Sequence, residues 1–233
     1  MFCSSEPTPY DVRFGLWGIP VRVHPFFWLF AALLGWNVDD LPGTALWIAC
    51  VFVSVLVHEL GHALTARQCG WRPHIVLTAF GGYAAYFPTW RISTAQRIGI
   101  IFAGPAAGFL LYSLMLALKQ SLVGNGFYTP QALEIPLNFR LIQVVGFLLY
   151  INLWWSLFNL LPVYPLDGGQ IMREVLGHWR RDGVRLALQI SFAVACLGAV
   201  YFLFVLRPSR TFNGLLFASL AFDNYQMLNS RRY

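Results

Sequence analysis

The stretch "GTALWIACVFVSVLVHELGHALTA", residues 43–66, is long and apolar enough to form a membrane-spanning helix, because about 20 mostly apolar residues cross the hydrocarbon core of a bilayer. Three ionisable side chains, those of His58, Glu59 and His62, interrupt it. A charged side chain at the centre of a membrane helix costs roughly 2.5–3.5 kcal/mol, so such residues usually face the protein interior and have a function. The stretch therefore predicts a membrane helix that carries a polar site.

The rest of the chain has a similar composition. Of its 233 residues, 58% are hydrophobic and 11% are charged, whereas about 25% of the residues of a typical soluble domain are charged. We expect an all-α membrane protein, a polytopic bundle of about six transmembrane helices, with residues 1–233 forming a single transmembrane domain. The predicted spans are residues 25–38, 43–66, 97–118, 140–163, 184–206 and 211–228.

The 16 lysines and arginines are scattered between these spans. They form no basic run, so we expect the lipid bilayer and no nucleic acid as a partner. With six spans, twelve of the cations lie on the side that holds both termini and four lie on the other side. Cytoplasmic loops are rich in lysine and arginine, so this asymmetry predicts a multi-pass protein of the plasma (inner) membrane with both termini in the cytoplasm.

The segment "HIVLTAFGGYAAYF", residues 74–87, is apolar and rich in β-branched and aromatic residues. With Gly81-Gly82 at its centre, it predicts a small membrane-associated β-hairpin around a glycine turn. An open hairpin cannot face lipid with unpaired edge amides, so it must lie against protein or line a cavity. Two interpretations stay open: the hairpin only packs on the protein surface, or its edge accepts a peptide as an added strand.

His58 and His62 are four residues apart, so a helix places both imidazoles on one face, close enough to share a metal ion. With Glu59 they form the motif H-E-x-x-H, in which the carboxylate acts on water beside a zinc ion. The alternative is that these side chains only hold helices together.

A hydrolytic zinc site takes three protein ligands and one water molecule, so a third ligand is needed. We favour Asp167, because prolines and glycines on either side break the helix and let a short carboxylate turn inward. The alternative for Asp167 is a plain helix cap. The other candidates for the third ligand are His24, His178 and Asp223.

"HELGH" together with "NLLPVYPLDGG", residues 159–169, resembles the site-2 protease family of intramembrane zinc metalloproteases, in its compact form without a PDZ or CBS domain. The resemblance implies that His58, His62 and Asp167 hold one Zn²⁺ and that Glu59 is the catalytic acid and base. It also implies that Asn159 is a polar helper near the substrate, and that the enzyme hydrolyses membrane-anchored proteins in or near their transmembrane segments.

Two pairs of glycines add to this interpretation. Gly81 and Gly82 are predicted to help hold an unwound substrate peptide, whereas Gly104 and Gly108 in "FAGPAAG" predict a small-xxx-small packing face. The alternative functions are a catalytically inactive relative that binds membrane helices, or an ion or metal transporter. The intact Glu59 argues against the first, and the lack of internal repeats argues against the second.

Overall fold

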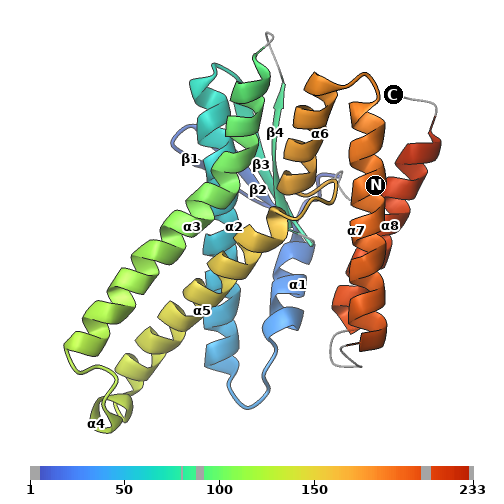
Figure 1. Ribbon diagram of the computed structural model, residues 1–233. Coiled ribbons are helices and arrows are strands. Elements are labelled where there is room, and N and C mark those ends of the chain that lie inside the picture. The colour runs from blue at the N-terminus through green and yellow to red at the C-terminus, as the bar shows by residue number, and fades with distance from the viewer. Residues whose placement is uncertain (1–5, 80, 88–91, 206–210, 231–233) are drawn as a thin grey trace. The chain divides into compact units, whose positions relative to one another are not determined.

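The computed structural model describes residues 6–79, 81–87, 92–205 and 211–230 (Figure 1). They form two compact units, each described here by itself. The histidine unit contains Phe2–Arg91 and Ala103–Ser156, and the aspartate unit contains Ile92–Phe102 and Leu157–Tyr233.

The histidine unit is built around a long helix and a small sheet. Its helices are α1 (Pro25–Gly35), α2 (Leu41–Gln68), α4 (Pro130–Leu133) and most of α3 (Thr94–Gly124) and α5 (Pro136–Asn159). Its strands are β1 (Val12–Leu16), β2 (Ile19–Val23), β3 (Arg72–Thr78) and β4 (Gly81–Phe87).

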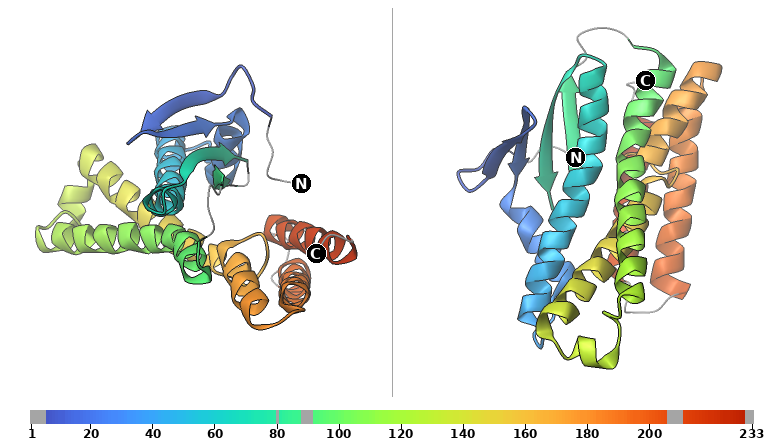
Figure 2. Two further views of the ribbon diagram at one scale, coloured as in Figure 1. Left: turned by 90° about the horizontal axis from the view of Figure 1, so that it is seen from above. Right: turned by 90° about the vertical axis from the view of Figure 1, so that its left-hand side faces the viewer.

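The four strands form one sheet in the order β1-β2-β3-β4, in which β2 and β3 run parallel and the other two pairs run antiparallel. The apolar faces of β2 and β3 pack against α2, as Figure 2 shows from the side. This core contains Val23, Ile75 and Leu77 of the sheet with Val55 and Ala63 of the helix. The sheet is therefore fixed to the same helix that carries the H-E-x-x-H motif.

The predicted hairpin at residues 74–87 is confirmed as β3 and β4, but its predicted turn is misplaced. Gly81 pairs with Thr78 and Gly82 pairs with Leu77, so both glycines lie inside β4. Residue 80 of the predicted hairpin lies outside the described residues. The hairpin formed by β1 and β2 was not predicted at all, because the sequence analysis assigned no structure before residue 25.

The aspartate unit contains α6 (Asp167–Trp179), α7 (Gly183–Val200) with its π-helical continuation η1 (Tyr201–Val205), and α8 (Thr211–Asn229). Helices α7 and α8 lie side by side (Figure 1). The loop between α5 and α6 inserts Val163, which is fully buried, into an apolar cluster with Ala195, Leu220 and Ala221.

Each of the six predicted spans corresponds to a helix, which confirms the class of a helical membrane protein with a small β-element. Among the described residues, four helices are long and apolar enough to cross a membrane: α2, α3, α5 and Gly183–Val205. Helix α1 has only 11 residues, or roughly 16 Å at 1.5 Å per residue, and α8 is not among the four. A count of six spans is therefore not confirmed, and residue 206 of the fifth predicted span lies outside the described residues.

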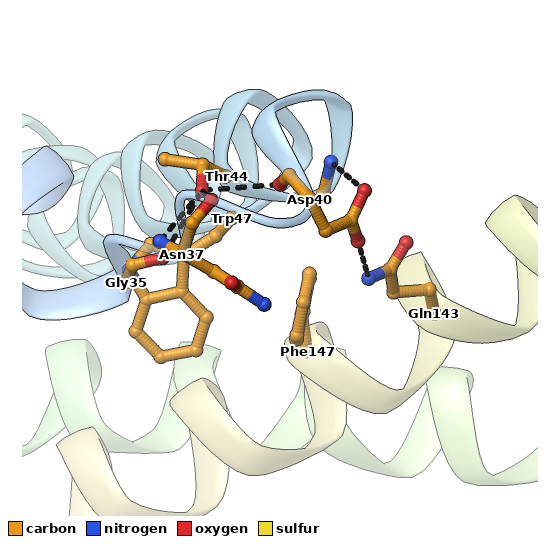
Figure 3. A pocket seen from close by; sticks show the side chains of 8 residues that line it. Gly35, Asn37, Asp40, Thr44, Trp47, Gln143 and Phe147 are labelled. Atoms are coloured by element: carbon orange, nitrogen blue, oxygen red, sulfur yellow. Dashed lines mark hydrogen bonds between the residues drawn. The ribbon is translucent and has the colours of Figure 1, made fainter.

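Hydrogen bonds connect the loop between α1 and α2 to the start of α5, beside a cavity of about 300 Å³ (Figure 3). The carboxylate of Asp40 accepts hydrogen bonds from the Gly43 amide at 3.0 Å, from Arg140 at 2.8 Å and from Gln143 at 3.0 Å. The pKa of Asp40 lies well below its usual range, mainly because its carboxylate accepts the hydrogen bond from Arg140. Because these polar groups are hydrogen-bonded to one another, we interpret this region as a structural connection between the α1–α2 loop and α5, called the Asp40 joint below.

Candidate metal centre

The two histidines of the H-E-x-x-H motif meet on one face of α2. His58 and His62 are 2% and 8% exposed, and their Nε2 atoms are 3.2 Å apart. Two imidazole nitrogens bound to one tetrahedral zinc ion, with bonds of about 2.0–2.1 Å, lie roughly 3.3 Å apart. The spacing of the two rings in the structure therefore fits a single ion.

Glu59 is buried beside the first residues of β4. A Cβ atom at Gly82 would lie 2.7 Å from Glu59 Cγ and 2.9 Å from its Oε1, closer than real Cβ atoms approach other atoms. With Glu59 in this position, the glycine lets the strand pass this close to the carboxylate. The sequence analysis singled out Gly82 for its role in a turn, whereas the structure uses it for close approach.

Gly81 serves the same strand in a second way. Its φ angle of +121° lies in a region that side chains other than glycine's rarely adopt. A Cβ atom there would also lie 2.9 Å from the ring of Trp155 on α5. The Trp155 ring in turn meets the edge of His58, with 6.5 Å between ring centroids. Strand β4 and helix α5 thus enclose the two motif residues His58 and Glu59.

The glycines of α3 bring that helix against α2. A Cβ atom at Gly104 would clash with the imidazole of His62, and one at Gly61 would clash with the backbone of Ala103. The predicted packing role of Gly104 is therefore confirmed, and its contact is with a candidate ligand. Gly108 makes room for the hydroxyl of Ser156 in the same way.

A buried polar contact one helical turn before His58 was missed by the sequence analysis. Asn152 on α5 donates from Nδ2 to the Ser54 hydroxyl at 2.9 Å and to the Leu148 carbonyl at 2.8 Å. Ser54 and Asn152 are each 1% exposed. An asparagine inside an apolar span is a signal that could have indicated this contact, because polar side chains in membrane helices commonly bond across helices.

In the aspartate unit, Asp167 is buried, with 7% of its surface exposed, and is the first residue of α6. The N-cap position is occupied by Leu166, and Asp167 is the acidic residue in the first turn of the helix. A Cβ atom at Gly168 or Gly169 would clash with the backbone of the loop from Leu160 to Tyr164. The "DGG" sequence therefore lets α6 begin directly on top of that loop.

The remaining candidate residues are placed as follows. Asn159 is the half-buried last residue of α5. His24 caps α1, where its Nδ1 accepts a hydrogen bond from the Phe26 amide at 3.2 Å. His178 is exposed at the end of α6, and Asp223 is half-buried on α8.

A buried H-E-x-x-H pair on a membrane helix is the arrangement of a metallopeptidase site. The chain belongs to peptidase family M50, whose profile matches residues 46–201. The predicted membership of the site-2 protease family is thereby confirmed.

Similar proteins carry related names. Rip3 of Mycobacterium tuberculosis is 34% identical over 186 residues, covering 77% of this chain and 44% of that protein. Zinc metalloprotease MJ0392 of Methanocaldococcus jannaschii is 31% identical over 171 residues, covering 72% of this chain and 46% of that protein. Stage IV sporulation protein FB of Bacillus subtilis is 27% identical over 219 residues, covering 92% of this chain and 68% of that protein.

The chain spans about half the length of the first two of these relatives. The solved structure of a site-2 protease from Methanocaldococcus jannaschii matches with a TM-score of 0.59 and 25% sequence identity. That match covers 96% of this chain and 98% of the other. The printed names of Rip3 and MJ0392 both contain "zinc metalloprotease", which agrees with zinc as the metal.

Proposed function

We propose that this protein is an intramembrane zinc metalloendopeptidase that hydrolyses peptide bonds in or near the transmembrane segments of membrane-anchored proteins. The observation that carries the proposal is the pair of buried imidazoles at 3.2 Å with the buried carboxylate of Glu59 between them in sequence, on a helix that can span a membrane. The family membership supports the same chemistry.

One zinc ion is held by His58, His62 and Asp167 in this proposal. Three observations support the set: all three side chains are buried, the histidine spacing fits one ion, and the His62 ring is held against Gly104, where a Cβ atom would clash with it. Two histidines and one carboxylate are a donor set that would suit a hydrolytic zinc ion.

When bound, the zinc ion supplies Lewis acidity, which polarises the scissile carbonyl and lowers the pKa of water towards about 7. The Glu59 carboxylate accepts a proton as the water oxygen bonds to the carbonyl carbon. Glu59 then delivers that proton to the leaving nitrogen as the C–N bond breaks, so the products are a carboxylic acid and an amine. The burial of Glu59 keeps bulk water from competing for its proton.

The edge of β4 presents the substrate in an extended form. A helical substrate hides its carbonyls in internal hydrogen bonds, so it must unwind locally before cleavage. Strand β4 is at the end of the strand order and its second residue, Gly82, passes beside Glu59, so a peptide added to this edge would run close to the carboxylate. Asn159 assists as a polar group near the substrate or intermediate.

The protein lies in the plasma (inner) membrane with both termini in the cytoplasm, and the whole chain is one transmembrane protease domain. His58 precedes Arg67 by nine residues, so it lies roughly 13 Å from the cytoplasmic boundary at 1.5 Å per residue. Water must therefore enter through a cavity, which we place on the cytoplasmic side.

The test is metal analysis of the purified chain beside the Glu59→Gln variant, with a single-span substrate whose helix is destabilised. We expect one zinc per chain in both proteins and cleavage by the unmodified chain alone. Equal cleavage by both proteins would refute the role of Glu59. Zinc binding without cleavage by either protein would favour an inactive relative that binds membrane helices.

A further inference from the structure

Two buried polar side chains from outside both sequence motifs hold the loop that precedes Asp167. Ser191 on α7 and Asn224 on α8 are each 0% exposed. A fully buried polar side chain is costly unless it is hydrogen-bonded, so its partners identify what it does.

Both side chains bond to the backbone of one residue, Tyr164. The Tyr164 amide donates to the Ser191 hydroxyl at 3.0 Å, and Asn224 Nδ2 donates to the Tyr164 carbonyl at 2.6 Å. Asn224 also donates to the Leu220 carbonyl of its own helix at 2.8 Å, which fixes the orientation of the amide. The backbone of Tyr164 is thus bonded on both sides by the α7–α8 pair.

Tyr164 needs these partners because the chain is not helical there. The loop from Leu160 to Leu166 leaves backbone groups without helical partners, and such groups must be satisfied by side chains when no water is at hand. The neighbouring residue Val163 is 0% exposed in its apolar cluster with Ala195 and Leu220. The loop is therefore held by apolar packing at Val163 and by two hydrogen bonds at Tyr164.

Only two residues separate Tyr164 from Asp167, and the connection is stiff. The Leu166 amide donates to the Val163 carbonyl at 2.9 Å. Gly169 lies so close to the backbone of Val163 and Tyr164 that a Cβ atom would clash there. A displacement of Tyr164 would therefore be passed on to the first turn of α6, where Asp167 lies.

We propose that Ser191 and Asn224 are positioning residues for Asp167: they fix the loop so that the Asp167 carboxylate is held ready to bind zinc. This inference rests on the proposed function for the identity of the metal. Asn224 lies beyond the matched family region, which ends at residue 201. The inference also explains why α8 carries an asparagine on its buried side.

The experiment uses the full chain in detergent with the variants Ser191→Ala and Asn224→Leu. Ser219→Ala is the matched control, because its hydroxyl on α8 bonds only to the Leu216 carbonyl among the described residues. The zinc affinity of each folded protein is measured by competition with a fluorescent chelator. Hydrogen exchange of the segment 160–169 is measured in the metal-free proteins.

We expect zinc affinity to fall about 10- to 100-fold in Ser191→Ala and Asn224→Leu, as it does when groups that orient a metal ligand are removed. Exchange of the loop amides should rise about fivefold or more in the metal-free proteins, since each variant loses a hydrogen bond. The Ser219→Ala control should match the unmodified chain in both measurements. Asn224→Leu introduces a larger change, so Ser191→Ala decides the matter if Asn224→Leu does not fold.

The two failures are distinguishable. If the unmodified chain and Asp167→Asn bind zinc equally or not at all, the proposed ligand set falls, and with it the positioning of a zinc ligand. If the unmodified chain binds zinc and Asp167→Asn does not, but Ser191→Ala keeps full affinity and unchanged loop exchange, the positioning role alone is overturned.

Discussion

The two units hold the proposed metal ligands in contrasting ways. In the histidine unit, His58 and His62 lie on one continuous helix, whose repeat places both imidazoles on one face with their Nε2 atoms 3.2 Å apart. In the aspartate unit, Asp167 begins a helix after an irregular loop that is held by residues far away in sequence. The placement of the two histidines is thus determined mainly within one helix and that of Asp167 by tertiary structure, so mutations should affect the proposed histidine and aspartate ligands differently.

The largest effect is expected when one histidine of the pair on α2 is removed. His62→Ala removes one of the three proposed ligands, so zinc affinity should fall roughly a hundredfold or more. The matched control is His178→Ala, which changes an exposed histidine on α6 and should leave affinity unchanged. Titration with zinc under competition from a chelator measures both. Full zinc affinity in His62→Ala would show that the histidine pair is not the centre of the site.

A smaller effect is expected from a substitution on α3, the helix that packs against His62. In Gly104→Ala the added methyl group would clash with the His62 ring, so zinc affinity should fall roughly 10- to 100-fold. Gly99→Ala on the same helix is the control, because nothing lies within 4 Å of a Cβ there. That control should keep its affinity and gain roughly 0.5–1 kcal/mol of stability from a better helix former. Equal zinc affinities in Gly104→Ala and Gly99→Ala would show that Gly104 has no role in the metal site.

The strand beside Glu59 should affect catalysis more than metal binding. Gly82→Ala would push β4 away from the carboxylate, so kcat for a membrane substrate should fall about tenfold while zinc content stays the same. Gly15→Ala on β1 is the control in the same sheet, since its nearest atom would be at an ordinary 3.9 Å. Steady-state kinetics with zinc analysis separates the two effects. Unchanged kcat in Gly82→Ala would mean that the close approach of β4 has no catalytic importance.

The smallest effect is expected at the Asp40 joint of Figure 3, which lies at the start of α2, far from the H-E-x-x-H motif. The pKa of Asp40 is lowered in the folded protein by its hydrogen bonds from Arg140 and Gln143. A lowered pKa contributes stability above the unfolded value of about 3.9, and that stability is lost as the pH falls through the folded value. The stability advantage over Asp40→Asn should therefore be present at pH 7 and shrink below about pH 4. Thermal unfolding at both pH values measures it, and an advantage that grows in acid would contradict the assigned sign.

The same contrast explains what could be predicted from the sequence. The spans and the shared face of His58 and His62 follow from apolar runs and the repeat of a helix, both of which are local. The hairpin of β1 and β2 is local, with a two-residue turn at Trp17-Gly18, and it was missed because the sequence analysis assigned no structure before residue 25; only its pairing with β3 joins residues about 50 apart. The turn at Gly81-Gly82 was misplaced because close approach to Glu59 and Trp155 is a tertiary constraint. Ser191 and Asn224 are polar residues inside predicted spans, which is a signal of a buried contact, but nothing local in the sequence identifies Tyr164 as their partner.

X-ray absorption at the zinc edge of the purified chain, beside Asp167→Asn, tests the central claim most directly. The account predicts a four-coordinate shell of nitrogen and oxygen at about 2.0–2.1 Å with scattering from two imidazoles. In Asp167→Asn the zinc should be lost or its shell altered. Sulfur neighbours at about 2.3 Å, or a zinc shell that Asp167→Asn leaves unchanged, would contradict it.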